Sequence, residues 1–578
     1  MTESRVFTWK IGGIAGGGQQ AAGLIFTKAC VRGGLYAFDS SEYPSRIRGG
    51  LVTYRVSVSE EVVSAIYKET HLLIALTREA FDVCLNDVTA DGVILYDSDN
   101  FKIEESQARG KKIYPLPLSQ LAKEAGVLPI AANIIITGAC AALLNYDFAV
   151  LEEVIGDVFA AKGKEVVEMN KKAARFGRQY AIDHLDPEGF PHNLNFKKKT
   201  KNSIVATAND TVSLGAVAAG CKFFASYPMT PASSILHTLA AWAERTGMIV
   251  KHPEDEISAI HMAIGASFAG VRSMTATSGG GFALMNEGLA LAAMTETPLV
   301  IVESQRPAPA TGLPTWTEQG DLAYVTHAGH GDFIRVVLAP GDSAEAFYLT
   351  AKAFNLAEKY QIPVIILLDK YISEGHQTIT DPDISKIEID RGKLLSNKEL
   401  VKLKEYKRYQ VTADGVSPRS IPGQPGGVHL ANSDEHDEEG FTIEGFTPQI
   451  RIQQVEKRMA KLNYILQDLP IPQLFGPKEA EITLIGWGST KGVVLEALKY
   501  VEGVNYLHVT APWPLNEETL RRAVHSVKRL ICIENNAVGQ FANILRELAN
   551  IDVDERILKY DGAQFFPTEI VEAVNKFK

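Results

Sequence analysis

The sequence predicts a multi-domain α/β protein, and two observations carry this prediction. The chain has 578 residues, which is too long for one hydrophobic core and indicates several domains. Apolar runs of strand length alternate with helix-length segments over residues 203–375 and again over residues 471–578. Strands and helices that alternate in this way form a parallel sheet with helices on both faces, a doubly wound arrangement.

The composition is that of an ordinary globular protein. The net charge is -11 and the mean hydropathy is -0.02, so no strongly basic face indicates nucleic acid. No apolar run reaches the roughly 20 residues of a membrane span, and the first residues lack the pattern of a signal segment. We therefore expect no nucleic-acid partner, no membrane association and a cytoplasmic location. Five scattered cysteines without a C-x-x-C pair predict buried free thiols and no iron–sulfur cluster on this chain.

The first domain is expected over residues 1–190, with a linker over residues 191–202 that contains prolines and a lysine cluster. A short strand at residues 9–14 leads through Gly16-Gly17-Gly18 into a helix. With Ala21 and Asp39 this segment matches the looser dinucleotide-binding fingerprint, so an NAD-dependent dehydrogenase is an alternative. Glycines at such a turn also serve close packing alone. Further expected elements are strands at 51–58, 71–76 and 93–96 and a helix at 133–144.

A second segment of this domain, YPSRIRGG, places Arg46 and Arg48 two residues apart beside two glycines. Guanidinium groups and exposed backbone N–H groups suit phosphate. An exposed hairpin with two solvated arginines explains the same pattern, and the sequence does not choose between these interpretations.

The stretch from Tyr227 to Asp321 organises the chain. Four expected strands, at 222–226, 248–251, 273–276 and 298–303, each end at residues of distinctive chemistry. These are Thr230 in YPMTP, Glu256 in PEDEI, the glycines 279–281 and Arg306. Parallel sheets bind ligands where strand carboxyl ends meet helix N-termini, so we expect these residues on one rim. Thr230 is also expected to cap a helix that has Pro231 in its first turn.

Together these motifs resemble a known family. YPMTP, PEDEISAIHMAIGASFAG, TSGGG and SQRPAPATGLPT followed by QGDL resemble, in this order, domain I of the 2-oxoacid:ferredoxin oxidoreductases. IAGGGQQ and YPSRIRGG resemble the gamma domain of the same family. The resemblance implies a gamma domain at 1–190 fused to a thiamine pyrimidine-binding type domain at 203–375. An irregular connection at 376–470 and a domain at 471–578 similar to the transketolase C-terminal domain complete the expected organisation.

The resemblance also implies roles for individual residues. Thiamine catalysis needs a buried carboxylate hydrogen-bonded to N1′ of the pyrimidine ring, and the motif assigns this role to Glu256. Spacing alone does not separate Glu256 from Glu254 and Asp255, since all three complement a helix N-terminus. Thr230 and Arg306 match the residues that hold the substrate 2-oxoacid, whose carboxylate suits a bidentate guanidinium. Arg46 and Arg48 lie in the domain expected near coenzyme A.

One expected motif is missing from the chain. Thiamine diphosphate is anchored through Mg²⁺ by a Gly-Asp-Gly segment, and no Gly-Asp-Gly occurs here. The resemblance therefore implies a beta subunit that holds the diphosphate, Mg²⁺ and the 4Fe-4S cluster, in a dimer of alpha-beta heterodimers. Coenzyme A is the implied co-substrate and ferredoxin the electron acceptor. The expected reaction converts 2-oxoglutarate to its acyl-CoA and CO₂. A pyruvate- or indolepyruvate-specific enzyme and a non-catalytic scaffold are the alternatives.

Overall fold

A computed structural model of the chain describes residues 6–45, 49–194, 202–443, 445 and 447–578. The chain forms two compact units. The first contains the described residues of 1–206, 374–381 and 566–578. The second contains residues 207–373 and 382–565, again as far as they are described.

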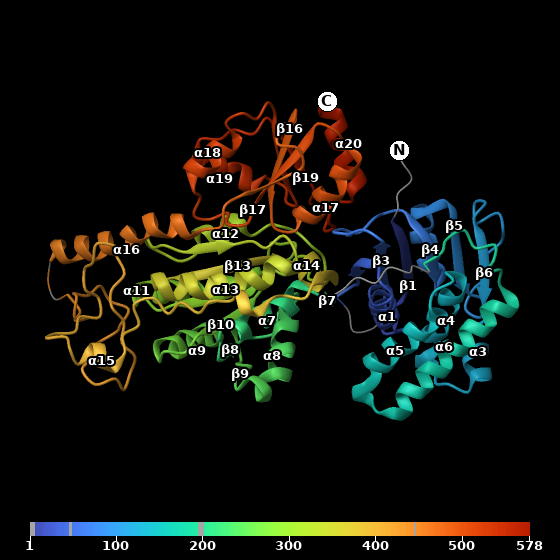
Figure 1. Cartoon of the computed structure of the whole chain (residues 1–578), viewed down its shortest axis with the longest axis horizontal. Coiled ribbons are helices and arrows are strands. Elements are labelled where there is room, and N and C mark those ends of the chain that lie inside the picture. The colour runs from blue at the N-terminus through green and yellow to red at the C-terminus, as the bar shows by residue number, and fades with distance from the viewer. Residues whose placement is uncertain (1–5, 46–48, 195–201, 444, 446) are drawn as a thin grey trace. The chain divides into compact units, whose positions relative to one another are not determined.

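The first unit is built on an eight-stranded sheet with the strand order β6-β5-β4-β1-β3-β2-β14-β7 (Figure 1). β1, β4, β5 and β6 run parallel, whereas β3 is antiparallel to both β1 and β2. The strands are β1 Phe7–Ile14, β2 Tyr36–Glu42, β3 Leu51–Ser59, β4 Thr70–Ala75, β5 Val88–Asp97, β6 Lys112–Leu116, β7 Ser203–Ala206 and β14 Gln377–Thr380. The helices are α1 Gln19–Arg32, α2 Arg78–Cys84, α3 Leu118–Ala125, α4 Ala132–Leu143, α5 Phe148–Phe159, α6 Lys164–His184 and α20 Pro567–Phe577.

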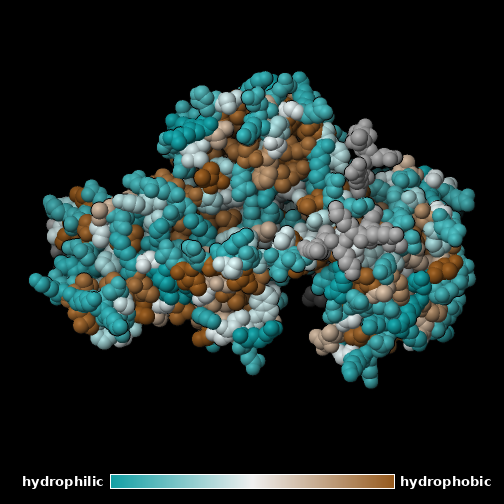
Figure 2. Space-filling model, in the orientation of Figure 1, coloured by the Kyte–Doolittle hydropathy of each residue, from teal (hydrophilic) through white to brown (hydrophobic). Residues whose placement is uncertain are grey.

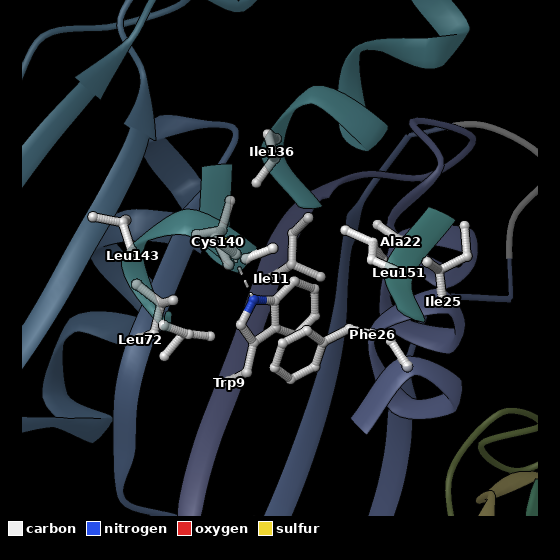
Figure 3. Packing of buried hydrophobic residues seen from close by; sticks show 14 of the residues in the cluster. Trp9, Ile11, Ala22, Ile25, Phe26, Leu72, Ile136, Cys140, Leu143 and Leu151 are labelled. Carbon is white, nitrogen blue, oxygen red and sulfur yellow. Dashed lines mark hydrogen bonds between the residues drawn. The ribbon is translucent and has the colours of Figure 1, made fainter. Parts of the chain in front are cut away.

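Alternate residues of the strands in this sheet pack into two separate cores. Leu72 and Ile74 of β4 belong to the core formed with α1, α4 and α5, whereas Leu73 and Ala75 pack with α2, as the period of two in a strand requires. Figure 3 shows the centre of the first core, where Trp9 stacks on Phe26 with ring centroids 4.9 Å apart. The indole nitrogen of Trp9 donates a hydrogen bond to Cys140 Sγ at 3.5 Å. The sequence prediction of a helix continuing through residue 139 is confirmed by α4.

The second unit contains a parallel six-stranded sheet with the order β12-β13-β11-β10-β8-β9. The four strands expected from the Tyr227–Asp321 stretch are confirmed as β8, β9, β10 and β11. The strands are β8 Phe223–Ala225, β9 Ile249–Lys251, β10 Ser273–Thr277, β11 Leu299–Gln305, β12 Val336–Leu338 and β13 Pro363–Asp369. The helices are α7 Ala208–Ala218, α8 Ser233–Thr246, α9 Glu256–Phe268, α10 Gly279–Leu284, α11 Asn286–Met294, α12 Leu322–His327, α13 Ser343–Tyr360 and α14 Lys370–Glu374, whose last residue is counted with the first unit.

The expected helix cap at Thr230 is wrong. α8 begins at Ser233 and its N-cap position is Ala232, which offers no side-chain cap. A turn closed by the hydrogen bond from Ala232 N to Met229 O precedes the helix. The backbone carbonyl of Thr230 instead accepts a hydrogen bond from Arg306, 76 positions along the chain. A long-range contact thus replaces the local capping pattern.

The C-terminal part of the second unit is a smaller doubly wound sheet with the order β15-β17-β16-β18-β19. β16 to β19 are parallel and were expected from their apolar runs, apart from the edge strand β19. At the edge opposite β19, β15 pairs antiparallel with β17. The strands are β15 Gln473–Phe475, β16 Ile482–Trp487, β17 Val504–Val509, β18 Leu530–Glu534 and β19 Glu555–Leu558. The helices are α17 Thr490–Ala497, α18 Glu517–Val524 and α19 Gln540–Ala549.

The connection between these two sheets is largely irregular over its described residues, with α15 (Asn397–Leu400) its short α-helix before α16 (Pro448–Asp468). Buried ion pairs attach it to the larger sheet domain. Glu296 is fully buried and pairs with Lys457 and with Lys461, the latter at 2.6 Å. Burial lowers the pKa of Lys457 to about 8, although Glu296 raises it. Buried charges of this kind must be kept together, because removing one partner leaves the other charge buried without compensation for its desolvation.

All five cysteines are buried free thiols, as the sequence predicted. Within the described residues, no single helix is long and apolar enough to cross a membrane, although the pair Leu118–Ala125 and Pro129–Leu143, bent by 113°, satisfies the length and composition criteria together.

Candidate active site

The predicted site residues of the second unit follow the carboxyl ends of neighbouring strands, as expected. Thr230 lies five residues after β8, Glu256 opens α9 just beyond β9, and Gly279 opens α10 directly after β10. Arg306 is the first residue after β11. Parallel strands end at one edge of the sheet, so the fold gathers these residues where doubly wound proteins bind ligands.

Glu256 is a buried carboxylate with an unoccupied acceptor. Its side chain is 3% exposed, and its Oε1 atom has no hydrogen-bond donor among the described residues. Asp255, not Glu256, caps α9 through the backbone N–H of Ser258. Glu254 is exposed. Since a buried polar atom without a partner is costly, Glu256 has the environment of a residue that receives its partner from a ligand.

A glycine makes room for this carboxylate. A Cβ atom at Gly281 would lie 2.6 Å from Glu256 Oε1 and 2.1 Å from Thr277 Oγ1, both far inside van der Waals contact. A Cβ atom at the adjacent Gly280 would meet no atom within 4 Å. Of these two positions, only 281 therefore needs a glycine, because any larger residue there would clash with Glu256 and Thr277.

The structure brings Thr230 and Arg306 together. The Nη1 atom of Arg306 donates to the Thr230 carbonyl at 2.8 Å. Among the described residues, no carboxylate forms an ion pair with Arg306 and no group bonds the Thr230 hydroxyl. Four N–H donors of a half-buried guanidinium are thus left for a ligand, in the fork geometry that suits a carboxylate.

Two carboxyl groups, those of Asp321 and Glu303, interact with this arginine, and a third, that of Glu318, interacts with Asp321. Burial raises the pKa of Asp321 to about 6, although Arg306 lowers it. Burial and the charge of Asp321 raise the pKa of Glu318 to about 7. Burial, followed by the charge of Asp321, raises the pKa of Glu303 well above its usual value. Shifts of this size in a ligand-binding rim are typical of functional sites.

The smaller sheet holds the loop that carries Glu318 and Asp321. Gln319 exchanges backbone and side-chain hydrogen bonds with Asn535 at 2.7 and 3.0 Å and donates to the Trp487 carbonyl at 2.9 Å. Asn536 donates to the Gln319 carbonyl at 3.1 Å. The C-terminal part thus positions the loop before Asp321.

A second candidate site lies in the first unit, around the glycine-rich turn. Gly16 and Gly18 both have φ of 85°, which only glycine adopts readily, and they lead from β1 into the N-terminus of α1. A cavity of about 490 Å³ opens at the carboxyl ends of β1, β4 and β5. Its lining includes Ile14, Gly17, Thr77, Asp97, Ser119 and Lys123. Backbone N–H groups at a helix N-terminus and a nearby lysine suit a phosphate-bearing ligand.

Asp39 is not available to a dinucleotide ribose. Its carboxylate accepts hydrogen bonds from Thr27 Oγ1 at 2.8 Å, Tyr54 OH at 2.6 Å and the backbone N–H of His376 at 2.7 Å. It is 1% exposed. Asp39, the acid of the apparent dinucleotide-binding fingerprint, therefore connects β14 to the sheet. Since it cannot bind a ribose, the structural basis of the NAD-dependent alternative is removed. Arg46 and Arg48 lie outside the described residues.

A doubly wound sheet with a buried, unpartnered glutamate beside a glycine on its rim agrees with the expectation of a thiamine pyrimidine-binding type domain. A sequence model described as "Pyruvate flavodoxin/ferredoxin oxidoreductase, thiamine diP-bdg" matches residues 214–457, and one described as "Pyruvate ferredoxin/flavodoxin oxidoreductase" matches residues 8–180. The chain belongs to the 2-oxoacid:ferredoxin oxidoreductase family, as its alpha subunit with the gamma domain fused in front.

Two of the relatives below match nearly the whole chain, and one matches about two thirds of it. The alpha subunit of 2-oxoacid:ferredoxin oxidoreductase 2 from Aeropyrum pernix is 32% identical, covering 98% of this chain and 97% of its own. The 2-oxoglutarate synthase subunit KorA of Methanothermobacter thermautotrophicus is 35% identical over 64% of this chain and 97% of its own. The solved 2-oxoglutarate:ferredoxin oxidoreductase of Magnetococcus marinus, with 2-oxoglutarate, coenzyme A and succinyl-CoA bound, has a TM-score of 0.92. It is 33% identical and covers 99% of this chain and 100% of its own.

Sequence reasoning missed two features of the site. From the sequence, Glu303 is only the last residue of an expected apolar strand. A charged residue inside the buried run Leu299–Gln305 is nevertheless unusual and indicates a functional environment. The pairing of Gly281 with Glu256 was also missed, because 25 residues and a strand separate them.

Proposed function

We propose that this chain, together with a beta subunit, catalyses the coenzyme A-dependent oxidative decarboxylation of 2-oxoglutarate, with ferredoxin as electron acceptor. The observation that carries the proposal is the buried, unpartnered carboxylate of Glu256 on the same sheet edge as the Thr230–Arg306 pair. The first group suits a thiamine pyrimidine ring and the second a 2-oxoacid.

Glu256 is proposed to bind the pyrimidine ring through N1′. The fit rests on Oε1, which lacks a donor, and on the space that Gly281 leaves beside it. Thiamine diphosphate, when bound, supplies the centre that accepts the electron pair released by decarboxylation. The contribution of Glu256, which is buried, is to share a proton between its carboxylate and N1′ of the ring.

Arg306 and Thr230 are proposed to bind the substrate. Arg306 pairs with the 2-oxoacid carboxylate through its remaining N–H groups, while its Nη1 bond to Thr230 O fixes the direction of the guanidinium. The Thr230 hydroxyl is placed to donate to the substrate's oxo or carboxylate oxygen. Because Arg306 holds the backbone carbonyl of Thr230, the two residues position the substrate together.

Coenzyme A is proposed to bind the first unit through the cavity at Gly16–Gly18. The N-terminus of α1, capped by no side chain, and Lys123 offer donors for phosphate. Ile14, which is 52% exposed, and Val127 line the same cavity and provide apolar surface beside these polar groups. Arg46 and Arg48 are proposed as further phosphate contacts from the adjoining sequence.

The beta subunit is proposed to hold the diphosphate, Mg²⁺ and the 4Fe-4S cluster. In the part of the chain that the structure describes, no group of three or more His, Cys, Asp or Glu side chains is arranged to hold a metal ion, and the sequence lacks Gly-Asp-Gly. Exposed apolar residues lie near Glu256: Ile257, Met262 and Leu284 are 44%, 43% and 51% exposed. Figure 2 shows apolar surface in the region of α9, which supports a covering partner in a dimer of alpha-beta heterodimers.

The preference for 2-oxoglutarate over pyruvate or indolepyruvate rests on the relatives. Both KorA and the Magnetococcus enzyme carry 2-oxoglutarate in their names. The test is copurification from the native source, followed by reduction of a viologen dye with each 2-oxoacid in turn. We expect a smaller partner containing iron and thiamine, and dye reduction that requires coenzyme A and is fastest with 2-oxoglutarate. A chain that purifies alone and shows no 2-oxoacid-dependent reduction contradicts the proposal.

A further inference from the structure

Glu303 is the most unusual carboxyl group of the second unit. It is fully buried, and neither of its oxygens has a hydrogen-bond donor among the described residues. It lies near the end of β11, between Thr277 of β10 and Leu367 of β13 in the sheet register. An ionised carboxylate without any donor in such a place is far more costly than a neutral carboxylic acid.

The strand period shows what Glu303 faces. Gln305, two residues on and therefore on the same face, accepts the backbone N–H of Asp321 at 2.9 Å. Glu303 is thus directed toward the start of α12, where Asp321 is 8% exposed and its Oδ2 atom also lacks a donor. The charged and titratable groups around it are Asp321, Asp369, Arg306 and, more remotely, Tyr324.

Asp369 provides a comparison within the same cluster. Its Oδ1 atom receives hydrogen bonds from Thr317 Oγ1 at 3.3 Å and from the backbone N–H groups of Tyr371 and Ile372 at 3.0 and 3.4 Å. These donors support a negative charge on Asp369. Both oxygens of Glu303 lack a donor, whereas Asp321 lacks one only at its buried Oδ2 and Asp369 Oδ1 accepts three hydrogen bonds, so a proton shared among these acids resides on Glu303.

We propose that Glu303 is a positioning residue that remains protonated beside Arg306, so that the positive charge of Arg306 is left for the substrate carboxylate. The inference rests on the proposed function of Arg306. With Glu303 ionised, two buried negative charges, those of Glu303 and Asp321, compensate the charge of Arg306 and weaken its attraction for an anionic 2-oxoacid. With Glu303 neutral, the charge of the guanidinium is less compensated and attracts the substrate. The raised pKa of Glu303, caused by burial and then by Asp321, agrees with this assignment.

The test uses the Glu303→Gln variant in the complete complex, with Glu287→Gln, an exposed acid on α11, as the control. Gln is a neutral isostere of a protonated Glu, so the KM for the 2-oxoacid at neutral pH is expected to stay within about twofold of wild type. Any rise of the wild-type KM at alkaline pH that comes from ionisation of Glu303 is expected to occur with little change in kcat and to be absent in Glu303→Gln. A KM about tenfold higher in Glu303→Gln than in wild type at neutral pH, or an alkaline rise in KM that is undiminished in the variant, overturns the proposal.

A second measurement needs only the chain itself. A proton bound more tightly by the folded than by the unfolded chain makes the free energy of unfolding fall as pH rises above the ordinary pKa of Glu. Glu303→Gln removes this loss, so its Tm is expected to equal or exceed that of wild type at about pH 8, with the difference shrinking toward about pH 5. A lower Tm at the higher pH contradicts a protonated Glu303. Absence of 2-oxoacid-dependent activity in wild type contradicts the proposed function instead, and the Tm result distinguishes the two failures.

Discussion

Replacing Gly281 by alanine tests the placement of Glu256 directly. The new Cβ would lie 2.6 Å from Glu256 Oε1 and 2.1 Å from Thr277 Oγ1, whereas ordinary contact begins near 3.4 Å. To relieve this clash, Glu256 must move by about 0.8 Å, the difference between 3.4 and 2.6 Å, unless α10 moves instead. A misplacement near 1 Å in a catalytic group costs up to ~100-fold in rate. We therefore expect kcat to fall about 10- to 100-fold, with a smaller effect on the KM for the 2-oxoacid.

The assay is steady-state dye reduction by the complex, with thermal unfolding measured on the same preparations. Gly280→Ala, on the same helix, is the matched control, because a Cβ atom at this position meets no atom within 4 Å. Overpacking at Gly281 is also expected to destabilise the fold by about 1–3 kcal/mol.

A double variant separates packing from catalysis. Thr277→Ala removes the closest clashing atom, so Gly281→Ala in that background is expected to regain stability. The contact with Glu256 remains, and kcat is expected to stay low. If Gly281→Ala and Gly280→Ala turn over equally fast, the carboxylate of Glu256 is not held where the proposed role requires it, and the reasoning is refuted.

Three further predictions concern charged residues. Arg306→Met is expected to raise the KM for the 2-oxoacid by about 100-fold, or roughly 3 kcal/mol, because a substrate carboxylate then lacks its partner; an unchanged KM, with exposed Arg245→Met as control, rejects Arg306 as its ligand. Glu296→Gln leaves two buried lysines uncompensated and is expected to lower the free energy of unfolding by about 3–5 kcal/mol in urea titrations, and a loss below about 1 kcal/mol contradicts this. Burial raises the pKa of Glu345, but His508 and Lys491 lower it by more, so that the pKa falls to about 2; the stabilisation by Glu345 is therefore present above the unfolded pKa and is lost as pH falls from about 4.5 to about 2. Glu345→Gln is expected to remove roughly 3 kcal/mol of this acid dependence, and an acid-unfolding curve identical to wild type is the opposing result.

The positions of the rim residues could be read from the sequence because they depend on local order. Apolar runs of three to seven residues set the strands, and the residue after each run marks the end of a strand. In a parallel sheet those ends share one edge whatever the strand order. Glu256, Arg306 and Thr230 could therefore be placed on one rim before their contacts were known.

The tertiary structure decided which atoms meet, because those contacts join residues distant in sequence. Arg306 takes the Thr230 carbonyl and replaces the expected helix cap. Asp39 is used by His376, 337 positions away, which ends its apparent role in a nucleotide fingerprint. Glu303 lies in an apolar strand in the sequence, and only its burial without donors, facing Asp321, shows it as a neutral acid. Periodicity specifies which face of an element is buried, but packing between elements specifies the partner of each polar group, and the chemistry of this site depends on those partners.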